Sequence, residues 1–154
     1  MSFIIVRIDD RLVHGQVIES WCKKLKIDHI IVSNDAVAGD SMQRSLITLA
    51  VPSYIKVSVL TVEQTGGLLL SGKTSQDRVI VLLSSPRDVV NLLKTGFKIA
   101  EINVGGLHYS QGKVQVSKTI SLSDDDLDAL DELDDMGVKL EMRILPTDPK
   151  VDMN

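Results

Sequence analysis

The stretch Arg7-Ile8-Asp9-Asp10-Arg11-Leu12-Val13-His14-Gly15-Gln16-Val17 follows a short apolar run, Phe3 to Val6, and precedes an apolar pattern typical of a helix. The run is rich in β-branched residues and favours a strand that is buried on both faces. The stretch therefore lies between the carboxyl end of a first strand and the start of a first helix, where open α/β sheets bind their ligands. Two arginines, two aspartates and a histidine exceed what a simple turn needs, which points to chemistry.

The residues after this stretch predict a helix with one buried face. Their apolar side chains are spaced at four and one, as on a helical stripe. The stripe consists of Val17, Ile18, Trp21, Cys22 and Leu25. Cys22 lies on it, so we interpret this cysteine as a core residue rather than a reactive thiol.

Strands and helices alternate along the rest of the chain. The expected strands are residues 28–33, 55–60, 79–83, 99–104 and 138–144, with one or two short strands inside 114–120, and the expected helices are 40–50, one that opens at 61, 85–96 and 123–137. We predict an α/β fold in a single domain, residues 1–154: a doubly wound, mostly parallel sheet with helices on both faces. Residues 146–154 are expected to form a loose tail.

The composition argues against several classes of protein. Seventeen basic and twenty-one acidic residues give a net charge of −4, whereas a general nucleic-acid binder needs a basic face. The only cysteine, with no secretory signal in view, suggests the cytoplasm. No segment approaches the roughly 20 apolar residues of a membrane helix. We therefore expect no direct membrane insertion, and any work at a membrane would require docking to an embedded partner.

His14 is the candidate reactive residue. A near-neutral imidazole offers a ring-nitrogen lone pair that can attack phosphorus. The phosphoryl oxygens then need donors, which we expect from Arg11 and Arg7 and from the backbone N–H groups around Gly15 and Gln16 at the start of the helix. Gly15 lacks a Cβ, which lets a phosphate or a partner's histidine approach. Phosphoryl transfer depends mainly on positioning and charge, so we expect no metal and no cofactor.

The two aspartates of the stretch would repel a phosphate if they faced it. We expect at least one of Asp9 and Asp10 to orient an arginine or the ring of His14. For Asp10 two interpretations stay open: a pocket residue that orients His14 or Arg11, and a turn residue or helix cap.

Other polar residues have more ordinary interpretations. His29 precedes a strand at the opposite, amino end of the sheet, where a surface or capping role is expected. His108 follows a strand on the rim of His14, so a role in the site or in docking stays open. Gly105-Gly106 also end a strand on that rim and are either a phosphate cradle or a tight turn. Ser84 ends another strand and is a candidate pocket residue, and Ser85 after it is interpreted as a helix cap. Asn34 and Asp35 stand at a further strand end.

The acidic run that starts at Asp124 lacks the glycine and the final glutamate of a calcium-binding loop. We interpret it as the solvated face of a helix whose first acids favour the helix dipole. The sequence also lacks the motifs of dinucleotide sites, P-loops, serine hydrolases and zinc sites.

The stretch from Arg7 to Val17 resembles the phosphohistidine loop of the IIB subunits of the mannose family in the bacterial sugar phosphotransferase system. That family includes transporters of mannose, fructose, sorbose and N-acetyl-hexosamines. Asn103-Val104-Gly105-Gly106 and the alternation of strands and helices are similar to it as well, and the resemblance covers the whole chain.

This resemblance implies a direction of transfer. The phosphohistidine of a IIA domain or subunit would donate its phosphoryl group to Nδ1 of His14. His14 would then phosphorylate a sugar as it passes through membrane-embedded IIC and IID subunits. The chain would be a protein-phosphohistidine–sugar phosphotransferase, cytoplasmic or held at the inner face of the membrane by those subunits.

Two rival functions keep the same pocket. A regulatory module would bind a phosphorylated partner or a small anion without turnover. A hydrolase would use His14 as a general base, but the sequence shows no nucleophile or metal pattern beside it.

Overall fold

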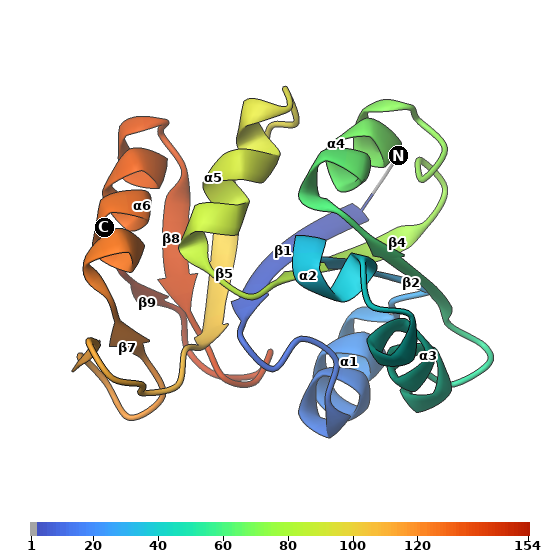
Figure 1. Ribbon diagram of the computed structural model, residues 1–154, viewed down its shortest axis with the longest axis horizontal. Helices are drawn as coiled ribbons and strands as arrows, with labels where there is room; N and C mark the ends of the chain where they lie inside the picture. The colour runs from blue at the N-terminus through green and yellow to red at the C-terminus, as the bar shows by residue number, and fades with distance from the viewer. Residues whose placement is uncertain (1–2) are drawn as a thin grey trace.

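The computed structural model describes residues 3–154, and its frame is a seven-stranded sheet in the order β3-β2-β4-β1-β5-β8-β9 (Figure 1). All neighbouring strands are parallel except β8 and β9. The strands of this sheet are β1 (Phe3–Asp9), β2 (His29–Ser33), β3 (Lys56–Leu60), β4 (Arg78–Leu83), β5 (Glu101–Gly106), β8 (Lys139–Met142) and β9 (Val151–Asp152). A separate antiparallel pair joins β6 (Val114–Gln115) to β7 (Ser121–Leu122).

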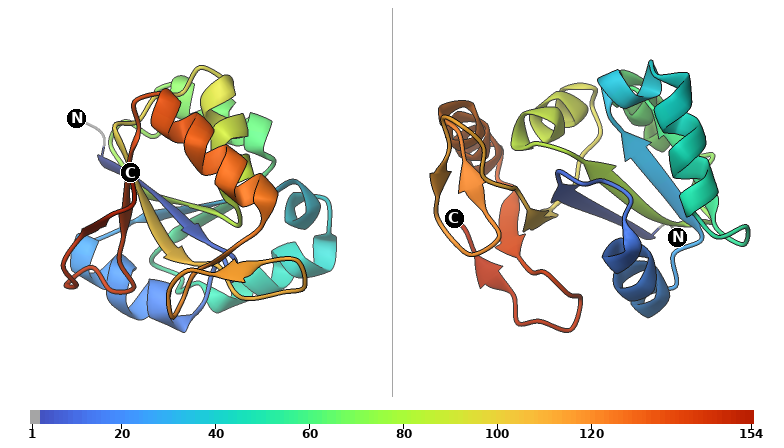
Figure 2. Two further views of the ribbon diagram at one scale, coloured as in Figure 1. Left: turned by 90° about the vertical axis from the view of Figure 1, so that its left-hand side faces the viewer. Right: turned by 60° about the horizontal axis from the view of Figure 1, so that its bottom comes forward.

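Helices cover both faces of the sheet, which confirms the predicted fold class (Figures 1 and 2). The helices are η1 (Val17–Cys22), α1 (Lys23–Leu25), α2 (Asp35–Ala38), α3 (Ser41–Ala50), α4 (Val62–Leu70), α5 (Pro86–Lys94) and α6 (Asp124–Asp135). One layer holds α4, α5 and α6, and the other holds η1, α1 and α3. No helix among the described residues is long and apolar enough to cross a membrane.

Two apolar clusters, one on each face, hold these layers to the sheet. Strand β4 shows how one strand serves both, because its side chains alternate in direction. Val79, Val81 and Leu83 belong to the cluster under α4, α5 and α6. Ile80 and Leu82 belong to the cluster that contains Trp21. Both faces of the central strands are therefore buried, as their β-branched sequences predict.

The connections after two neighbouring strands leave the sheet on opposite faces. Strand β1 continues into η1 on one face, and its neighbour β4 continues into α5 on the other. Such a divergence marks the place where open α/β sheets bind ligands, at the carboxyl ends of the strands. The loop that carries His14 leaves β1 at this place.

Several local predictions need correction. Residues 146–154 are not a loose tail: β9 pairs with β8, and the Asn154 side chain bonds the Val138 carbonyl at 2.8 Å. The short helix α2 was not predicted. Helix α3 buries no residue, and its Met42 side chain is 73% exposed. The helix after His14 is a π-helix at η1, a wider form that is often found at functional sites.

Candidate functional site

The His14 loop begins with a tight turn at the end of β1. The N–H of Leu12 donates to the carbonyl of Asp9 at 2.9 Å. Leu12 has φ +57°, a left-handed conformation that costs a non-glycine residue about 1–2 kcal/mol. Its side chain is buried against the Trp21 cluster, and burying a leucine contributes about 1.5–3 kcal/mol. The packing of Leu12 therefore offsets the strain and fixes where the loop turns toward His14.

Asp9 holds the ring of His14. Its Oδ2 lies 3.0 Å from Nε2 of His14, and its Oδ1 accepts the backbone N–H of Arg11 at 3.1 Å. Asp9 is fully buried, and burial alone would raise its pKa. The hydrogen bonds from His14 and Arg11, with the charges of His14 and Arg7, outweigh burial and lower the pKa of Asp9 below its usual value. A charged carboxylate at Nε2 favours the tautomer in which Nε2 carries the proton and Nδ1 the lone pair.

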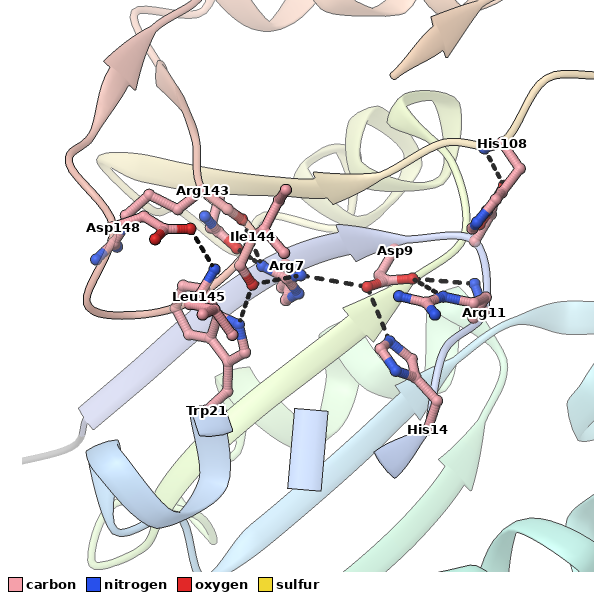
Figure 3. Close-up of polar contacts among 12 residues, drawn as sticks. Arg7, Asp9, Arg11, His14, Trp21, His108, Arg143, Ile144, Leu145 and Asp148 are labelled. Atoms are coloured by element: carbon pink, nitrogen blue, oxygen red, sulfur yellow. Dashed lines mark hydrogen bonds and ion pairs between the residues drawn. The ribbon is translucent and has the colours of Figure 1, made fainter. Parts of the chain in front are cut away.

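Arg7 lies beneath the loop rather than at its surface. Its side chain is 1% exposed, and its guanidinium lies 4.5 Å from the centre of the Trp21 ring. Nη2 donates to Oδ2 of Asp9 at 3.3 Å and to the carbonyl of Ile144 at 3.4 Å (Figure 3). Arg7 is one of the residues expected to donate to the phosphate; in the structure it holds Asp9, and it also lines the cavity described below.

Gly105 makes room for this arginine. A Cβ on Gly105 would lie 2.2 Å from the guanidinium carbon of Arg7. The pairing of β1 with β5 shifts by one residue there, so that Asp9 lies opposite Gly106. Close contact with Arg7 explains why position 105 is a glycine, and both Gly105 and Gly106 also line the cavity described below.

A row of buried polar side chains extends from Arg7 across the sheet. Arg7, Asn103 and Glu141 occupy paired positions on β1, β5 and β8. Nη1 of Arg7 donates to Oδ1 of Asn103 at 2.5 Å, and Nδ2 of Asn103 donates to Oε1 of Glu141 at 3.0 Å. Arg143 binds both oxygens of Glu141, at 2.9 and 2.8 Å. Sequence reasoning missed this row, because its members lie 38 and 96 residues apart.

A small cavity of about 170 Å³ opens beside the loop. Three of the residues expected to bind phosphate, Arg7, Arg11 and Gln16, line it, and so does Lys118. The Arg11 side chain is 48% exposed and its Nε lies 3.7 Å from Asp9. Gly15 is exposed, and a Cβ there would meet no atom within 4 Å. The loop therefore presents a half-exposed cation, Arg11, and an open approach at Gly15.

Asp10 binds neither His14 nor Arg11. Its Oδ2 accepts the backbone N–H of His108 at 2.7 Å, and its Oδ1 lies 2.6 Å from Nδ1 of that ring. Asp9, not Asp10, is the aspartate that holds the ring of His14. His108 does lie on the same rim as His14, as its position after a strand suggested.

Ser84 belongs to a different polar group on the rim. It accepts a hydrogen bond from Asn34 at 2.9 Å and lies 3.4 Å from Asp88. Within residues 3–154 no hydrogen bond joins Ser84 to the His14 loop. Asn34 also caps α2, Asp35 accepts the N–H of Val62, and Ser85 caps α5 as predicted.

His29 and Cys22 are both core residues. His29 lies at the amino end of the sheet but is 2% exposed, so of the surface or capping role that was predicted, the surface part is wrong. Its Nε2 lies 2.8 Å from Ser58 and its Nδ1 3.3 Å from Asp77. Burial raises the pKa of the Cys22 thiol to about 11, so this thiol stays protonated and unreactive.

Comparisons with known proteins agree with this geometry. The sequence model of the family described as the PTS system sorbose subfamily IIB component matches residues 3–154. A sorbose-specific EIIB component of Lacticaseibacillus casei is 38% identical over 153 residues, which are 99% of this chain and 93% of that protein. The mannose-specific EIIAB component of Escherichia coli strain K12 is 38% identical over 97% of this chain but only 46% of its own length.

The fold agrees as well. The solved IIBSor domain of the sorbose permease from Klebsiella pneumoniae superimposes with a TM-score of 0.91 and 38% identity, over 98% of this chain and 93% of that one. From the His14 loop, the sheet order and these matches we conclude that the chain belongs to the sorbose subfamily of the IIB components of the sugar phosphotransferase system, which are phosphotransferases.

Proposed function

We propose that His14 is the residue that carries the phosphoryl group, and that it carries it on Nδ1. The observation that supports this most is the 3.0 Å contact between Nε2 of His14 and Oδ2 of the buried Asp9. It occupies one ring nitrogen and directs the lone pair to the other. Among residues 3–154, no hydrogen-bond partner occupies Nδ1. His14 thus combines a free nucleophilic nitrogen with a fixed ring.

The transfer itself needs little covalent work from the protein. Nδ1 of His14 attacks phosphorus while the bond from phosphorus to the donor's histidine nitrogen breaks. Nε2 keeps its proton throughout, and the ring gains positive charge as the new bond forms. The charged carboxylate of Asp9 balances that gain, as a buried aspartate does for an imidazolium in other enzymes.

Arg11 supplies charge from the solvent side. The Arg11 side chain is half-exposed, so its guanidinium can turn toward the oxygens of a phosphoryl group on His14. The backbone N–H groups at residues 15–17 open the helix, and such groups favour an anion. Gly15 leaves the approach clear for a partner's side chain.

The partners follow from the family. The fused EIIAB relative places a IIA unit beside a IIB unit in one protein, and we propose a phosphorylated IIA domain or subunit as the donor here. We also propose that the acceptor is a sugar of the mannose, fructose, sorbose or N-acetyl-hexosamine class, presented by IIC and IID subunits that hold this chain at the membrane. The name of a relative does not fix the sugar, because relatives with three different sugar specificities match over nearly the whole chain.

Intact mass after incubation with a phosphorylated IIA domain tests the proposal. The reaction is quenched in alkali, because phosphohistidine survives base and is lost in acid. We expect the wild type and the control His108→Ala to gain one phosphate and His14→Ala to gain none. A phosphate on His14→Ala would refute the assignment. No phosphate on the wild type with several donors would favour a module that binds a phosphorylated partner without turnover.

A further inference from the structure

We infer that Asn103 and Glu141, with Arg143, are positioning residues for His14 that act through Arg7 and Asp9. The inference rests on the proposed function of His14. A continuous set of contacts leads from Glu141 on β8 through Asn103 to Arg7. Figure 3 shows its last part, from Arg7 to Oδ2 of Asp9 and from that same oxygen to Nε2 of His14. The reactive ring is thus connected to a strand that lies more than a hundred residues later in the sequence.

The contacts of Arg7 show why this row sets the position of Asp9. Nη1 is held by Asn103 and by the carbonyl of Arg143 at 3.0 Å. Nη2 is left for Asp9 and for the carbonyl of Ile144. A guanidinium is a rigid planar fork, so acceptors that fix Nη1 also fix the direction in which Nη2 meets Asp9. A shift of Arg7 would be passed to Asp9 and then to the ring of His14.

Asn103 keeps the two halves of the row apart. Its amide oxygen faces Arg7 and its amide nitrogen faces Glu141, an orientation set by a donor on one side and an acceptor on the other. Glu141 is meanwhile held by Arg143 through both of its oxygens. With Asn103 in between, Arg7 does not pair directly with Glu141, and its charge is available to Asp9.

The charges of the row balance without any contribution from His14. Arg7 and Arg143 are positive, and Asp9 and Glu141 are negative. Arg7, Asp9 and Glu141 are each at most 1% exposed, so a loss of one charge leaves its partner uncompensated in a dry environment. In the balanced row, the carboxylate of Asp9 can balance the positive charge that the ring of His14 gains during transfer.

Fold stability alone does not call for this row. The rest of the same face is apolar where it packs on Trp21 and its neighbours, and well-packed apolar residues generally replace a buried ion pair without loss of stability. A row of charged and amide side chains across β1, β5 and β8 that ends at the reactive histidine is better explained by control of its geometry.

Two variants of the full chain test the inference. Glu141→Gln removes one charge at nearly constant shape, and Asn103→Leu removes the amide at similar volume. The matched control is Glu132→Gln, which breaks another arginine–carboxylate pair, between α5 and α6. Thermal unfolding first shows which variants are folded.

The first readout is the tautomer of His14 in the unphosphorylated protein, from the ¹⁵N chemical shifts of its ring. The second is the single-turnover rate of phosphoryl acceptance as a function of donor concentration. We expect both row variants to lose part of the Nε2–H tautomer. We expect the rate at saturating donor to fall about tenfold, as is common when a supporting residue is removed. The donor concentration at half-maximal rate should hardly change, because the loop surface that meets the donor is intact. Glu132→Gln should match the wild type in the tautomer of His14, in the rate at saturating donor and in the donor concentration at half-maximal rate.

A folded row variant with the wild-type tautomer and the wild-type saturated rate would reduce the row to a structural role and overturn the inference. If Glu141→Gln does not fold, Asn103→Leu carries the test by itself, since it leaves the pair of Glu141 with Arg143 in place. A wild type that takes no phosphate would refute the proposed function, while the tautomer measurement would still decide whether the row positions the ring.

Discussion

His14 and His29 lie at opposite ends of the same sheet, and each is paired with an aspartate. In His29 both ring nitrogens are occupied, Nδ1 by Asp77 and Nε2 by Ser58. In His14 only Nε2 is held, by Asp9. The exposed side-chain fraction differs as well, 14% for His14 and 3% for His29. An aspartate partner is therefore common to both histidines. Among the described residues, what distinguishes His14 is a ring nitrogen without a hydrogen-bond partner and a more exposed side chain.

His108 extends the comparison to the third histidine of the chain. It also has an aspartate, Asp10, but the contact is made through Nδ1, and the side chain is 60% exposed. Nothing like the row behind Asp9 supports Asp10, which is itself partly exposed. His108 is exposed but has its Nδ1 held by Asp10, His29 is buried with both ring nitrogens held, and His14 is partly exposed with only its Nε2 held.

Asp9→Asn should have the largest effect on the property that sets His14 apart from the other two histidines. An amide can donate to Nε2 and so favour the wrong tautomer, a change that costs about 10⁴-fold in a comparable aspartate–histidine pair. We expect the rate of phosphoryl acceptance by His14 to fall at least about 100-fold on this basis. Rapid-quench measurement of phosphoprotein checks it, with Asp10→Asn as the matched control. Equal losses in the two variants would contradict the role given to Asp9.

Arg11→Ala should have an intermediate effect. The guanidinium is half-exposed and screened by water, so we expect acceptance to slow about tenfold, less than the 10²–10³-fold that a fully enclosed donor supplies. The free energy of unfolding should change by no more than about 0.5 kcal/mol, as for most surface substitutions.

The control is Arg44→Ala, which removes the same charge from the exposed face of α3. Single-turnover rates and urea unfolding measure both quantities. An acceptance rate in Arg11→Ala equal to that of Arg44→Ala would remove Arg11 from the pocket.

His29→Gln should leave acceptance unchanged and alter only stability. Burial, together with the charge of Lys56, lowers the pKa of His29 below 6.5, although Asp77 opposes the shift. The unfolded chain therefore binds a proton more readily than the folded one, so His29 makes the protein less stable as pH falls from about 6.5 toward its folded pKa. Above pH 6.5 this contribution is constant.

Urea unfolding at pH 7.5 and 5.5 measures the effect. The wild type should lose more unfolding free energy between the two pH values than His29→Gln does. Other titrating groups such as Asp88, whose pKa is raised by burial, cancel in that difference. Identical losses would show that His29 titrates normally in the folded protein.

The sequence predicted what depends on neighbouring residues. Strand periodicity, the serine and threonine caps and the loop at His14 are all local patterns, and the fold class, the helix starts and the position of His14 on the rim followed from them. Cys22 also lies in the core as its helical stripe predicted.

What the sequence did not show depends on contacts between distant segments. Asn103 and Glu141 look like the polar members of alternating strands, and only the register of β1, β5 and β8 brings them behind Arg7. The choice between Asp9 and Asp10 depends on a shift in that register at the end of β1. Strand β9 is two residues long and pairs with the edge of β8. A strand this short has no periodic pattern of its own, so the local sequence does not predict it.

The polar row has a consequence for the order in which the protein is made. The ribosome produces the His14 loop first, but Glu141, Arg143 and the carbonyl of Ile144 come more than 120 residues later. Until they arrive, Arg7 lacks three of its supports, directly or through Asn103. A nascent chain thus contains every residue of the His14 loop long before Arg7 has all the contacts that hold Asp9 in place. On the proposed function, we therefore expect a chain to accept phosphate only after β8 and the residues that follow it have been made.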